Sequence, residues 1–364
     1  MEYRVHRRTG DSISAIGIGT GPVFEASEKE GVGAFAYACE RGVNFVDFAT
    51  AGAKTFEYAG RALACVREKM LYQVHFGANY ETGEYGWTTE LETVKRQVDW
   101  QMKELKTDYI DFGFIHCLDS PSDWMAYREN GVLDFLLEMK KAGAVRHIGL
   151  SSHTPSLAGE VLDTGLVDQL MFSINPGYDC QYGEYANGSA GERMDLYRRC
   201  EAGGIGISVM KPFSGGQLLN AGTSPFGRAL TKYQCIQYAL DKPGVLTVLP
   251  GIRNLEDMKE ALGFFDASPE EKDYSVLGTF APKDVSGVCV YCNHCQPCPA
   301  GLNVGLINKY YDLAKMGDAL AADHYAKLEK KASDCVSCGH CDQRCPFHVA
   351  QAERMREIAA YFVR

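Results

Sequence analysis

The chain has 364 residues, of which 46% are apolar and 23% charged, so its composition is that of a folded protein and excludes wholesale disorder. Its 37 Lys and Arg residues against 47 Asp and Glu residues give a net charge of −10, which disfavours a nucleic-acid or anionic-membrane partner. No apolar run reaches the ~18 residues of a membrane span, and the first residues lack the apolar core of a secretion signal. We therefore expect a cytoplasmic protein.

Residues 13 to 266 alternate between short apolar runs and amphipathic stretches. The runs are rich in Val, Ile, Leu and Phe without strict alternation, which is typical of strands buried on both faces of a parallel sheet. The predicted strands are Ile16–Thr20, Val43–Phe48, Leu71–Phe76, Tyr109–His116, Val145–Ser151, Gln169–Asn175, Gly206–Lys211 and Val245–Leu249.

Helix signals lie between these strands. Ser27 with Glu30, and Thr89 with Glu92, have the spacing of a capping box, in which a hydroxyl and a carboxylate bind free backbone N–H groups. Glycines stand where a helix needs a left-handed residue before the next strand, at Gly42, Gly143 and Gly204.

Eight strand–helix repeats in about 250 residues predict an α/β fold of the (β/α)₈ barrel type, which we assign to residues 1–270. The alternative is a doubly wound open sheet, which normally has a G-x-G-x-x-G turn after its first strand. Here Gly17–Gly21 is followed by Pro22, Val23 and Phe24, so the turn lacks that form.

The repeat stops after Phe265, and Ser268 with Glu271 caps one more helix. We expect the domain boundary near Ala281-Pro282 and a small, mainly helical domain over residues 281–364. Its predicted helices lie around Leu306–Lys331 and at Ala350–Phe362.

Eight of the 14 cysteines lie between Cys289 and Cys345, in two runs that each end in Cys-Pro. The second run matches the C-x₂-C-x₂-C-x₃-C-P pattern of two-cluster ferredoxins, in which the fourth cysteine binds the other cluster. The first run differs only by having two residues before its fourth cysteine. We therefore expect two [4Fe–4S] clusters with exchanged fourth ligands. The expected sets are Cys289, Cys292, Cys295 with Cys345, and Cys335, Cys338, Cys341 with Cys298.

The alternative is that the cysteines of the tail bind zinc. A tetrahedral zinc site needs only four ligands, typically two C-x₂₋₄-C pairs, and two runs of four cysteines exceed that number. A disulfide scaffold would be small, secreted and cysteine-rich throughout, and this chain is not. Two clusters imply transfer of single electrons, for which a ferredoxin or a flavodoxin is the expected donor.

Polar residues recur where the predicted strands end. In a (β/α)₈ barrel these carboxyl ends meet at one pole, where the chemistry takes place. We expect Asp47, His75 and His116 to transfer protons, since imidazoles titrate near neutral pH. The alternatives are ordinary polar rim residues, or a divalent metal held by these three with His153. The full set of strand-end residues is Asp47, His75, His116, Ser151, Ser152, His153, Asn175, Lys211 and Arg253.

The first 266 residues resemble the aldo-keto reductases, and the tail is similar to that of the subfamily with a two-cluster ferredoxin domain after the barrel. The segments that carry the resemblance are 41–47, 109–116, 146–152, 209–216 and 249–253. The family uses Asp, Tyr, Lys and His in catalysis, with Tyr as the proton donor. Asp47 and His116 match, whereas the Tyr position is Gly52 and the Lys position is His75.

The resemblance implies a nucleotide site, but its last motif is only partly kept, with Pro250 to Arg253 and Glu260 present and Ala261 in place of Asn. Backbone N–H groups of the Ser214–Gly216 turn are candidates for a pyrophosphate. The residues that we assign to cofactor binding are Ser151, Ser152, Asn175, Lys211, Ser214, Gly215, Gly216 and Arg253. NAD(P) and a flavin both stay open as cofactors.

The leading hypothesis is an iron–sulfur oxidoreductase that couples cluster electron transfer to redox chemistry of a small polar carbonyl or hydroxyl compound. One alternative is an NAD(P)H-dependent carbonyl reductase whose clusters are structural or regulatory. Another is a non-enzymatic electron-transfer or redox-sensing protein. Because Gly52 lacks a phenol, the proton donor is His116, His75 or a tyrosine from elsewhere, such as Tyr58, Tyr80 or Tyr178.

Overall fold

The computed structural model describes residues 1–279, 287–318, 320–345 and 347–363. It falls into two compact units: the first comprises 1–174, 205–212 and 246–267, and the second comprises 175–204, 213–245 and 268–364. The predicted boundary at Ala281-Pro282 lies outside the described residues, so the division into 1–270 and 281–364 stays a prediction.

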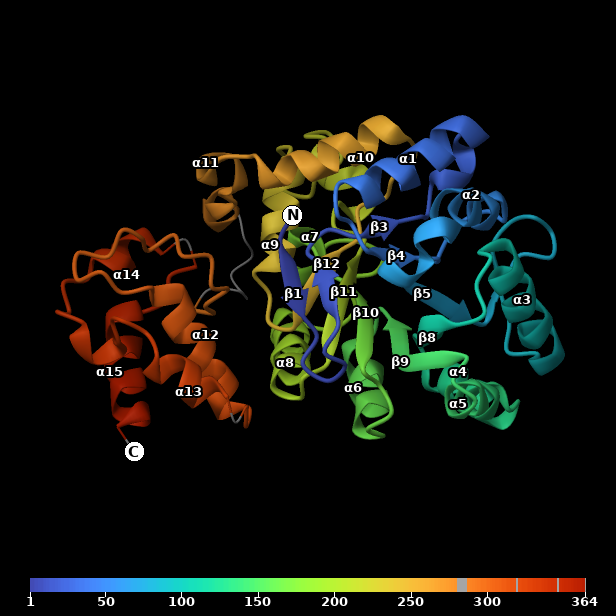
Figure 1. Ribbon diagram of the computed structural model, residues 1–364. Helices are drawn as coiled ribbons and strands as arrows, with labels where there is room; N and C mark the ends of the chain where they lie inside the picture. The colour runs from blue at the N-terminus through green and yellow to red at the C-terminus, as the bar shows by residue number, and fades with distance from the viewer. Residues whose placement is uncertain (280–286, 319, 346, 364) are drawn as a thin grey trace. The chain divides into compact units, whose positions relative to one another are not determined.

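The first unit contains a parallel sheet of eight strands in the order β12-β11-β10-β9-β8-β5-β4-β3 (Figure 1). Bridges from Ile16 to Val248 and from Gly19 to Gly251 join its first and last strands, so the sheet closes into a barrel. The strands are β3 (Ile18–Gly19), β4 (Phe45–Asp47), β5 (Leu71–Phe76), β8 (Ile110–Ile115), β9 (Val145–Ser152), β10 (Gln169–Ser173), β11 (Gly206–Met210) and β12 (Val245–Val248). Each of the eight predicted strands is confirmed.

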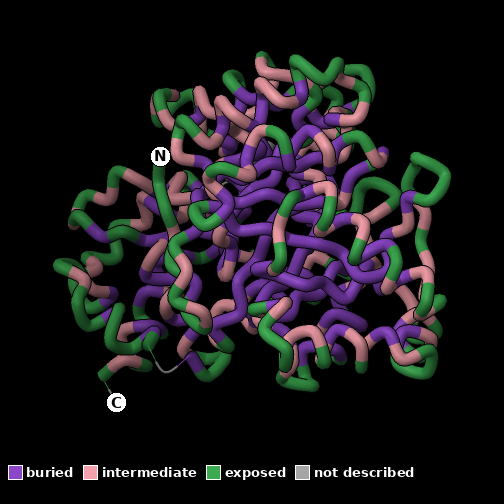
Figure 2. The backbone as a smooth tube through the Cα atoms, turned by 45° about the vertical axis from the view of Figure 1, so that its right-hand side comes forward, coloured by how far each residue is buried: buried purple, intermediate pink, exposed green. Residues whose placement is uncertain are grey.

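The barrel strands are buried on both sides, as their unbroken apolar runs predicted. Every residue of β5 and β8 is buried, and Figure 2 shows buried backbone concentrated in the central strands. Large buried side chains from these strands form one cluster, among them Phe45, Phe112 and Phe114. This packing fixes the strands that hold the polar residues.

Helices follow most strands of the first unit. Those whose residues all lie within it are α1 (Glu28–Glu40), α2 (Lys54–Leu63), α3 (Leu91–Glu104), α4 (Pro121–Glu129), α5 (Val132–Lys141), α6 (Pro155–Asp163) and α10 (Leu255–Leu262). The Ser27 capping box is confirmed, and Gly42 has the expected left-handed φ of 89°. The predicted Thr89 box is wrong: the Glu90 carboxylate caps α3, because the Thr89 hydroxyl accepts a hydrogen bond from Asn130.

Two hairpins of the first unit lie outside the predicted strands. β1 (Tyr3–Val5) pairs with β2 (Ser12–Ser14), and β6 (Ala78–Asn79) pairs with β7 (Gly86–Trp87), both antiparallel. The second hairpin follows β5 directly and so begins at the end of the strand that carries His75.

The second unit is mainly helical. Its helices are α7 (Pro176–Asp179), α8 (Ala190–Ala202), α9 (Lys232–Leu240), α11 (Pro269–Lys272), α12 (Val304–Lys315), α13 (Ala321–Ala326), α14 (His340–Arg344) and α15 (Gln351–Phe362). The predicted Ser268 capping box and the final helix are confirmed. The single region predicted at Leu306–Lys331 contains α12 and α13, and the short α14 inside the second cysteine run was not predicted.

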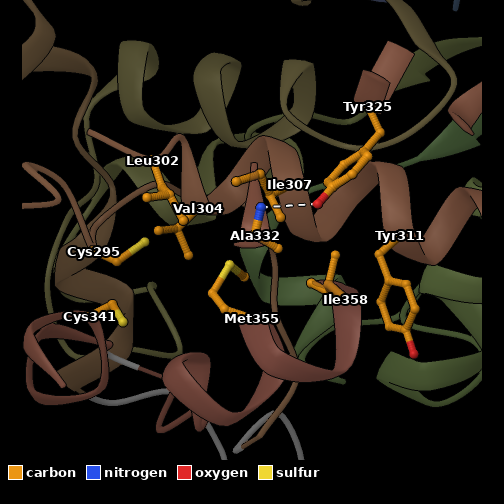
Figure 3. Close-up of a cluster of buried hydrophobic side chains, with 10 residues drawn as sticks. All are labelled: Cys295, Leu302, Val304, Ile307, Tyr311, Tyr325, Ala332, Cys341, Met355 and Ile358. Carbon is orange, nitrogen blue, oxygen red and sulfur yellow. Dashed lines mark hydrogen bonds between the residues drawn. The ribbon is translucent and has the colours of Figure 1, made fainter. Parts of the chain in front are cut away.

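An apolar cluster holds the tail helices together (Figure 3). Ile307 and Ile358, from α12 and α15, are fully buried in it, and the Ala332 N–H donates to the Tyr325 hydroxyl over 3.0 Å. Cys295 and Cys341 lie side by side at one end of the cluster. The core thus reaches the residues expected to bind iron and sulfide.

Candidate active site and cluster cavities

Three strand-end residues of the first unit form one hydrogen-bonded chain. Asp47 ends β4, His75 lies in β5 and His116 directly follows β8. Asp47 Oδ1 is 2.7 Å from His75 Nε2, and His75 Nδ1 is 2.9 Å from His116 Nδ1. All three side chains are buried. The structure therefore brings together the three residues predicted to transfer protons.

Two further polar residues hold the Asp47 end of this chain. Gln73 Nε2 donates to Asp47 Oδ1 over 2.8 Å, and the Ser208 hydroxyl donates to Gln73 Oε1 over 2.9 Å. Gln73 lies two residues before His75 on β5, so both side chains point to the same face of the strand. The sequence analysis missed both residues, although a Gln and a Ser inside apolar strands were a visible signal.

Tyr85 lies at the other end of the chain. It directly precedes β7, and its hydroxyl is 2.8 Å from His116 Nε2. The Trp87 indole N–H donates to the His116 carbonyl over 3.2 Å, which ties the hairpin to the end of β8. Tyr85 is 40% exposed. A chain of hydrogen bonds therefore connects buried Asp47 to a phenol at the surface.

The three tyrosines named as replacement proton donors have other contacts. The Tyr80 hydroxyl donates to the Thr50 carbonyl over 3.0 Å, and the Tyr58 hydroxyl donates to the Ala26 carbonyl over 3.4 Å. Tyr178 belongs to the second unit, where burial raises the pKa of its hydroxyl. Tyr85, which the sequence analysis did not consider, is the phenol that contacts His116.

Gly52 occupies a position with no room for a side chain. A Cβ at residue 52 would lie 2.7 Å from Phe24 Cβ, closer than such atoms approach. Its backbone pairs with Glu84 in an antiparallel bridge, and the Tyr85 N–H donates to the Ala51 carbonyl over 3.0 Å. The segment that lacks the phenol therefore lies beside the hairpin segment that carries one.

Electrostatics favours a neutral imidazole at His116. Burial first, and then the charges of His75 and His153, hold the pKa of His116 well below its ordinary value. A neutral imidazole has one donor and one acceptor nitrogen, so each ring in the chain passes on a hydrogen bond in one direction.

A second polar group lies after β8 and β9. His153 Nδ1 is 2.9 Å from Asp119 Oδ2, and the His153 backbone N–H donates to Asp119 Oδ1 over 2.6 Å. Within the described ranges, Cys117, Asp119 and His153 bring three ligand-type atoms within 4.8 Å of one another. The hydrogen bonds account for this closeness. The metal set suggested by sequence is not assembled, because His153 binds Asp119 rather than Asp47 or His75.

The residues assigned to a nucleotide are divided between the units. In the first unit, Ser151 and Ser152 end β9, Lys211 follows β11, and the exposed Arg253 forms an ion pair with Asp257 over 2.8 Å. In the second unit Asn175 caps α7, and Ser214, Gly215 and Gly216 form a turn with φ values of 51°, 64° and 91°. A Cβ on Gly215 or Gly216 would meet nothing within 4 Å, so this backbone is open to a ligand.

Two cavities of the second unit are lined by the cysteines of the tail. Each cavity is lined by thiols from both cysteine runs. The predicted ligand sets with exchanged fourth cysteines group the thiols in the same two sets. One cavity is lined by Cys289, Cys292, Cys295 and Cys345, and the other by Cys298, Cys335, Cys338 and Cys341 together with Cys295. The ligand assignment itself stays a prediction.

The chemistry of these thiols fits an iron–sulfur cluster. Burial raises the pKa of Cys292 to about 12 and that of Cys341 to about 11, so neither is a thiolate without a cationic ligand. The Val349 N–H donates to Cys345 Sγ over 3.4 Å and the Ser337 N–H donates to Cys335 Sγ over 3.4 Å. Such N–H···S bonds tune cluster potentials.

Residues 15–234 match the aldo/keto reductase family model, and residues 286–349 match a 4Fe-4S dicluster domain. The chain is 24% identical to L-galactose dehydrogenase of Arabidopsis thaliana over 71% of this chain and 86% of that protein. It is also 24% identical to an uncharacterized oxidoreductase of Bacillus subtilis over 46% of this chain and 56% of that protein.

Solved structures share the fold. An aldo-keto reductase from Bacillus halodurans aligns with a TM-score of 0.61 at 20% identity, over 78% of this chain and 97% of that one. A search of the described helices finds none with the length and hydropathy to cross a membrane. The two matched regions cover most of the barrel and both cysteine runs of the tail. The chain belongs to the aldo/keto reductase family and carries a C-terminal 4Fe-4S dicluster domain.

Proposed function

We propose that this oxidoreductase couples electron transfer through its clusters to the interconversion of a hydroxyl and a carbonyl group on a small polar substrate. Protons move through Asp47, His75 and His116. The observation that carries the proposal is the buried chain of hydrogen bonds between these three residues, which reaches the phenol of Tyr85. Interconversion of a hydroxyl and a carbonyl group moves a proton at the substrate oxygen, and a positioned acid–base side chain speeds that transfer.

The substrate class follows from the relay and from one relative. A group that exchanges a single proton at an oxygen suits an alcohol or a carbonyl compound. Similarity to a dehydrogenase of L-galactose supports a polyhydroxylated, sugar-like molecule. Hydroxyl compounds of the size of a sugar are therefore the first substrates to test.

For the tail we propose two [4Fe–4S] clusters, with ligand sets that exchange their fourth cysteine. The two cavities and their thiols support this assignment. Such clusters carry electrons singly, so a ferredoxin or a flavodoxin in the cytoplasm is the expected partner.

A nicotinamide cofactor, when bound, supplies or accepts a hydride. The open Gly215–Gly216 turn and Ser214 are the residues that we assign to its phosphates, since backbone N–H groups suit an anion. Ser151, Ser152, Asn175, Lys211 and Arg253 are the other residues proposed for this cofactor.

The test uses the full chain, purified without oxygen and with oxidised clusters. L-Galactose, other sugars and polyols are added alone, and cluster reduction is followed by absorbance and electron paramagnetic resonance. We expect a hydroxyl substrate to reduce the clusters of the wild-type protein. The His116→Gln variant should lose this substrate-dependent cluster reduction, and the control His324→Gln should retain it. Rapid NADPH-dependent reduction of a simple aldehyde by protein stripped of its clusters would contradict the proposal and favour an ordinary carbonyl reductase.

A further inference from the structure

The phenol of Tyr85 completes a chain of hydrogen bonds whose direction is set at its other end. Asp47 is the fixed point, because a carboxylate only accepts hydrogen bonds. Gln73 Nε2 and His75 Nε2 both lie within 2.8 Å of its Oδ1 atom, so both act as donors.

The direction then follows from ring to ring. With a single ring proton, on Nε2 and directed at Asp47, His75 has an acceptor at Nδ1, and in this tautomer that acceptor takes the proton of His116 Nδ1 over 2.9 Å. His116 is then left with an acceptor at Nε2, which takes the Tyr85 hydroxyl proton over 2.8 Å. In this pair of tautomers every donor in the chain points inward, from Tyr85 to Asp47.

We propose that Tyr85 is the residue that exchanges a proton with the substrate oxygen, and that the inward hydrogen bonds prepare it to take a proton from a substrate hydroxyl. The inference rests on the proposed function and adds to it the contacting residue and the favoured direction, which is alcohol oxidation. With its own proton directed at His116, the Tyr85 oxygen acts as the acceptor of the substrate proton.

The proton balance involves two bonds broken and two formed. The substrate O–H bond breaks as a new Tyr85 O–H bond forms, while the original Tyr85 O–H bond breaks and a His116 Nε2–H bond forms. The resulting positive charge is shared by His116 and His75 and is balanced by the Asp47 carboxylate. The carbon-bound hydrogen leaves with its electron pair to an acceptor of the nicotinamide class. Where oxidised clusters take the two electrons singly, that hydrogen leaves as a proton to water.

The hairpin makes this assignment specific to Tyr85. The Ala53 N–H donates to the Gly83 carbonyl over 2.9 Å, and the Tyr85 N–H donates to the Ala51 carbonyl over 3.0 Å, so the two backbones are held on both sides of Gly52. Phe24 fills the space beside Gly52. The phenol is therefore held from the hairpin, with Trp87 fixing the neighbouring end of β8.

The inferred direction of the hydrogen bonds can be tested without a substrate, by locating the ring protons of His75 and His116. The full chain is labelled with ¹⁵N at its nine histidines, and nitrogen shifts are recorded at neutral pH with oxidised clusters. We expect His116 to be protonated at Nδ1 and His75 at Nε2. Tyr85→Phe should move the His116 Nε2 resonance and leave the two protonation sites in place. A neutral His116 protonated at Nε2 would overturn the inferred direction.

Turnover tests the role of the phenol. Tyr85→Phe should lower kcat for alcohol oxidation by ~10²–10⁴-fold, with a smaller change in KM. The matched control is Tyr3→Phe, which removes a phenol of similar exposure that donates to the Gly42 carbonyl over 2.7 Å. Unchanged turnover in Tyr85→Phe would refute the role. If no variant and no wild-type protein oxidises an alcohol, the proposed function fails, whereas the nitrogen shifts still decide the direction of the chain.

Discussion

The proposed exchange of fourth ligands between the cysteine runs gives the sharpest test of the tail. Cys298 belongs to the first run by sequence, yet it lines the cavity of Cys335, Cys338 and Cys341. Replacing it by Ala should therefore damage the cluster of the second run. Because each cluster contains four irons, the iron content should fall from about eight to about four per chain.

The reciprocal variant and a neutral control complete this test. Cys345→Ala should remove the cluster held by the three cysteines of the first run, since Cys345 lines their cavity. Cys65→Ala removes an exposed thiol of the first unit and should leave iron unchanged. Iron and sulfide analysis with electron paramagnetic resonance of the reduced protein identifies the cluster that remains. Loss of the first-run cluster in Cys298→Ala would refute the exchange, and zinc in protein isolated without oxygen would refute the clusters.

Three further predictions concern the barrel. His116→Ala should lower turnover by ~10²–10⁴-fold. Asp47→Asn should lower turnover less, because the Asp47 carboxylate orients the hydrogen-bonded chain. An equal loss of turnover in the two variants would make Asp47 a direct participant in proton transfer. Gly52→Ala should lower the free energy of unfolding by about 1–3 kcal/mol in denaturant titrations, because the new Cβ meets Phe24 at 2.7 Å. In the control Gly33→Ala, on a helix, the new Cβ meets nothing within 4 Å, so this variant should be more stable. Because burial lowers the pKa of folded His116 below its unfolded value of about 6.5, the unfolded state takes up its proton first, and stability should fall as pH drops below that value. His116→Gln should flatten this dependence in unfolding curves at pH 5 to 7.5, and an unchanged slope would contradict the reasoning.

Strand periodicity was enough to predict the barrel, because the strands are continuous apolar runs of the length that a buried parallel sheet needs. The strand Leu71–Phe76 was predicted with its observed bounds. The rule that strand ends meet at one pole then placed Asp47, His75 and His116 together. Their mutual distances were beyond prediction, since these depend on strand register and side-chain rotamers.

Tyr85 could not be found from sequence for a different reason. It lies on a two-stranded hairpin with two residues in each strand, too short to show an alternating pattern. Its position beside Gly52 depends on backbone pairing between segments about thirty residues apart, which no local propensity encodes. The Thr89 cap failed similarly, because the competing hydrogen bond comes from Asn130.

The two departures from the family's catalytic residues explain each other. A lysine at position 75 would have only donors, so it would end a hydrogen-bonded chain that starts at Asp47. His75 has a donor for Asp47 and an acceptor for His116, so the chain continues through a second ring. That second ring offers an acceptor to a phenol, and the phenol now comes from Tyr85 because Phe24 leaves no room at Gly52. Replacing lysine by histidine thus puts a group with both a donor and an acceptor where the family has donors alone, which fits the proposed removal of protons from hydroxyl groups.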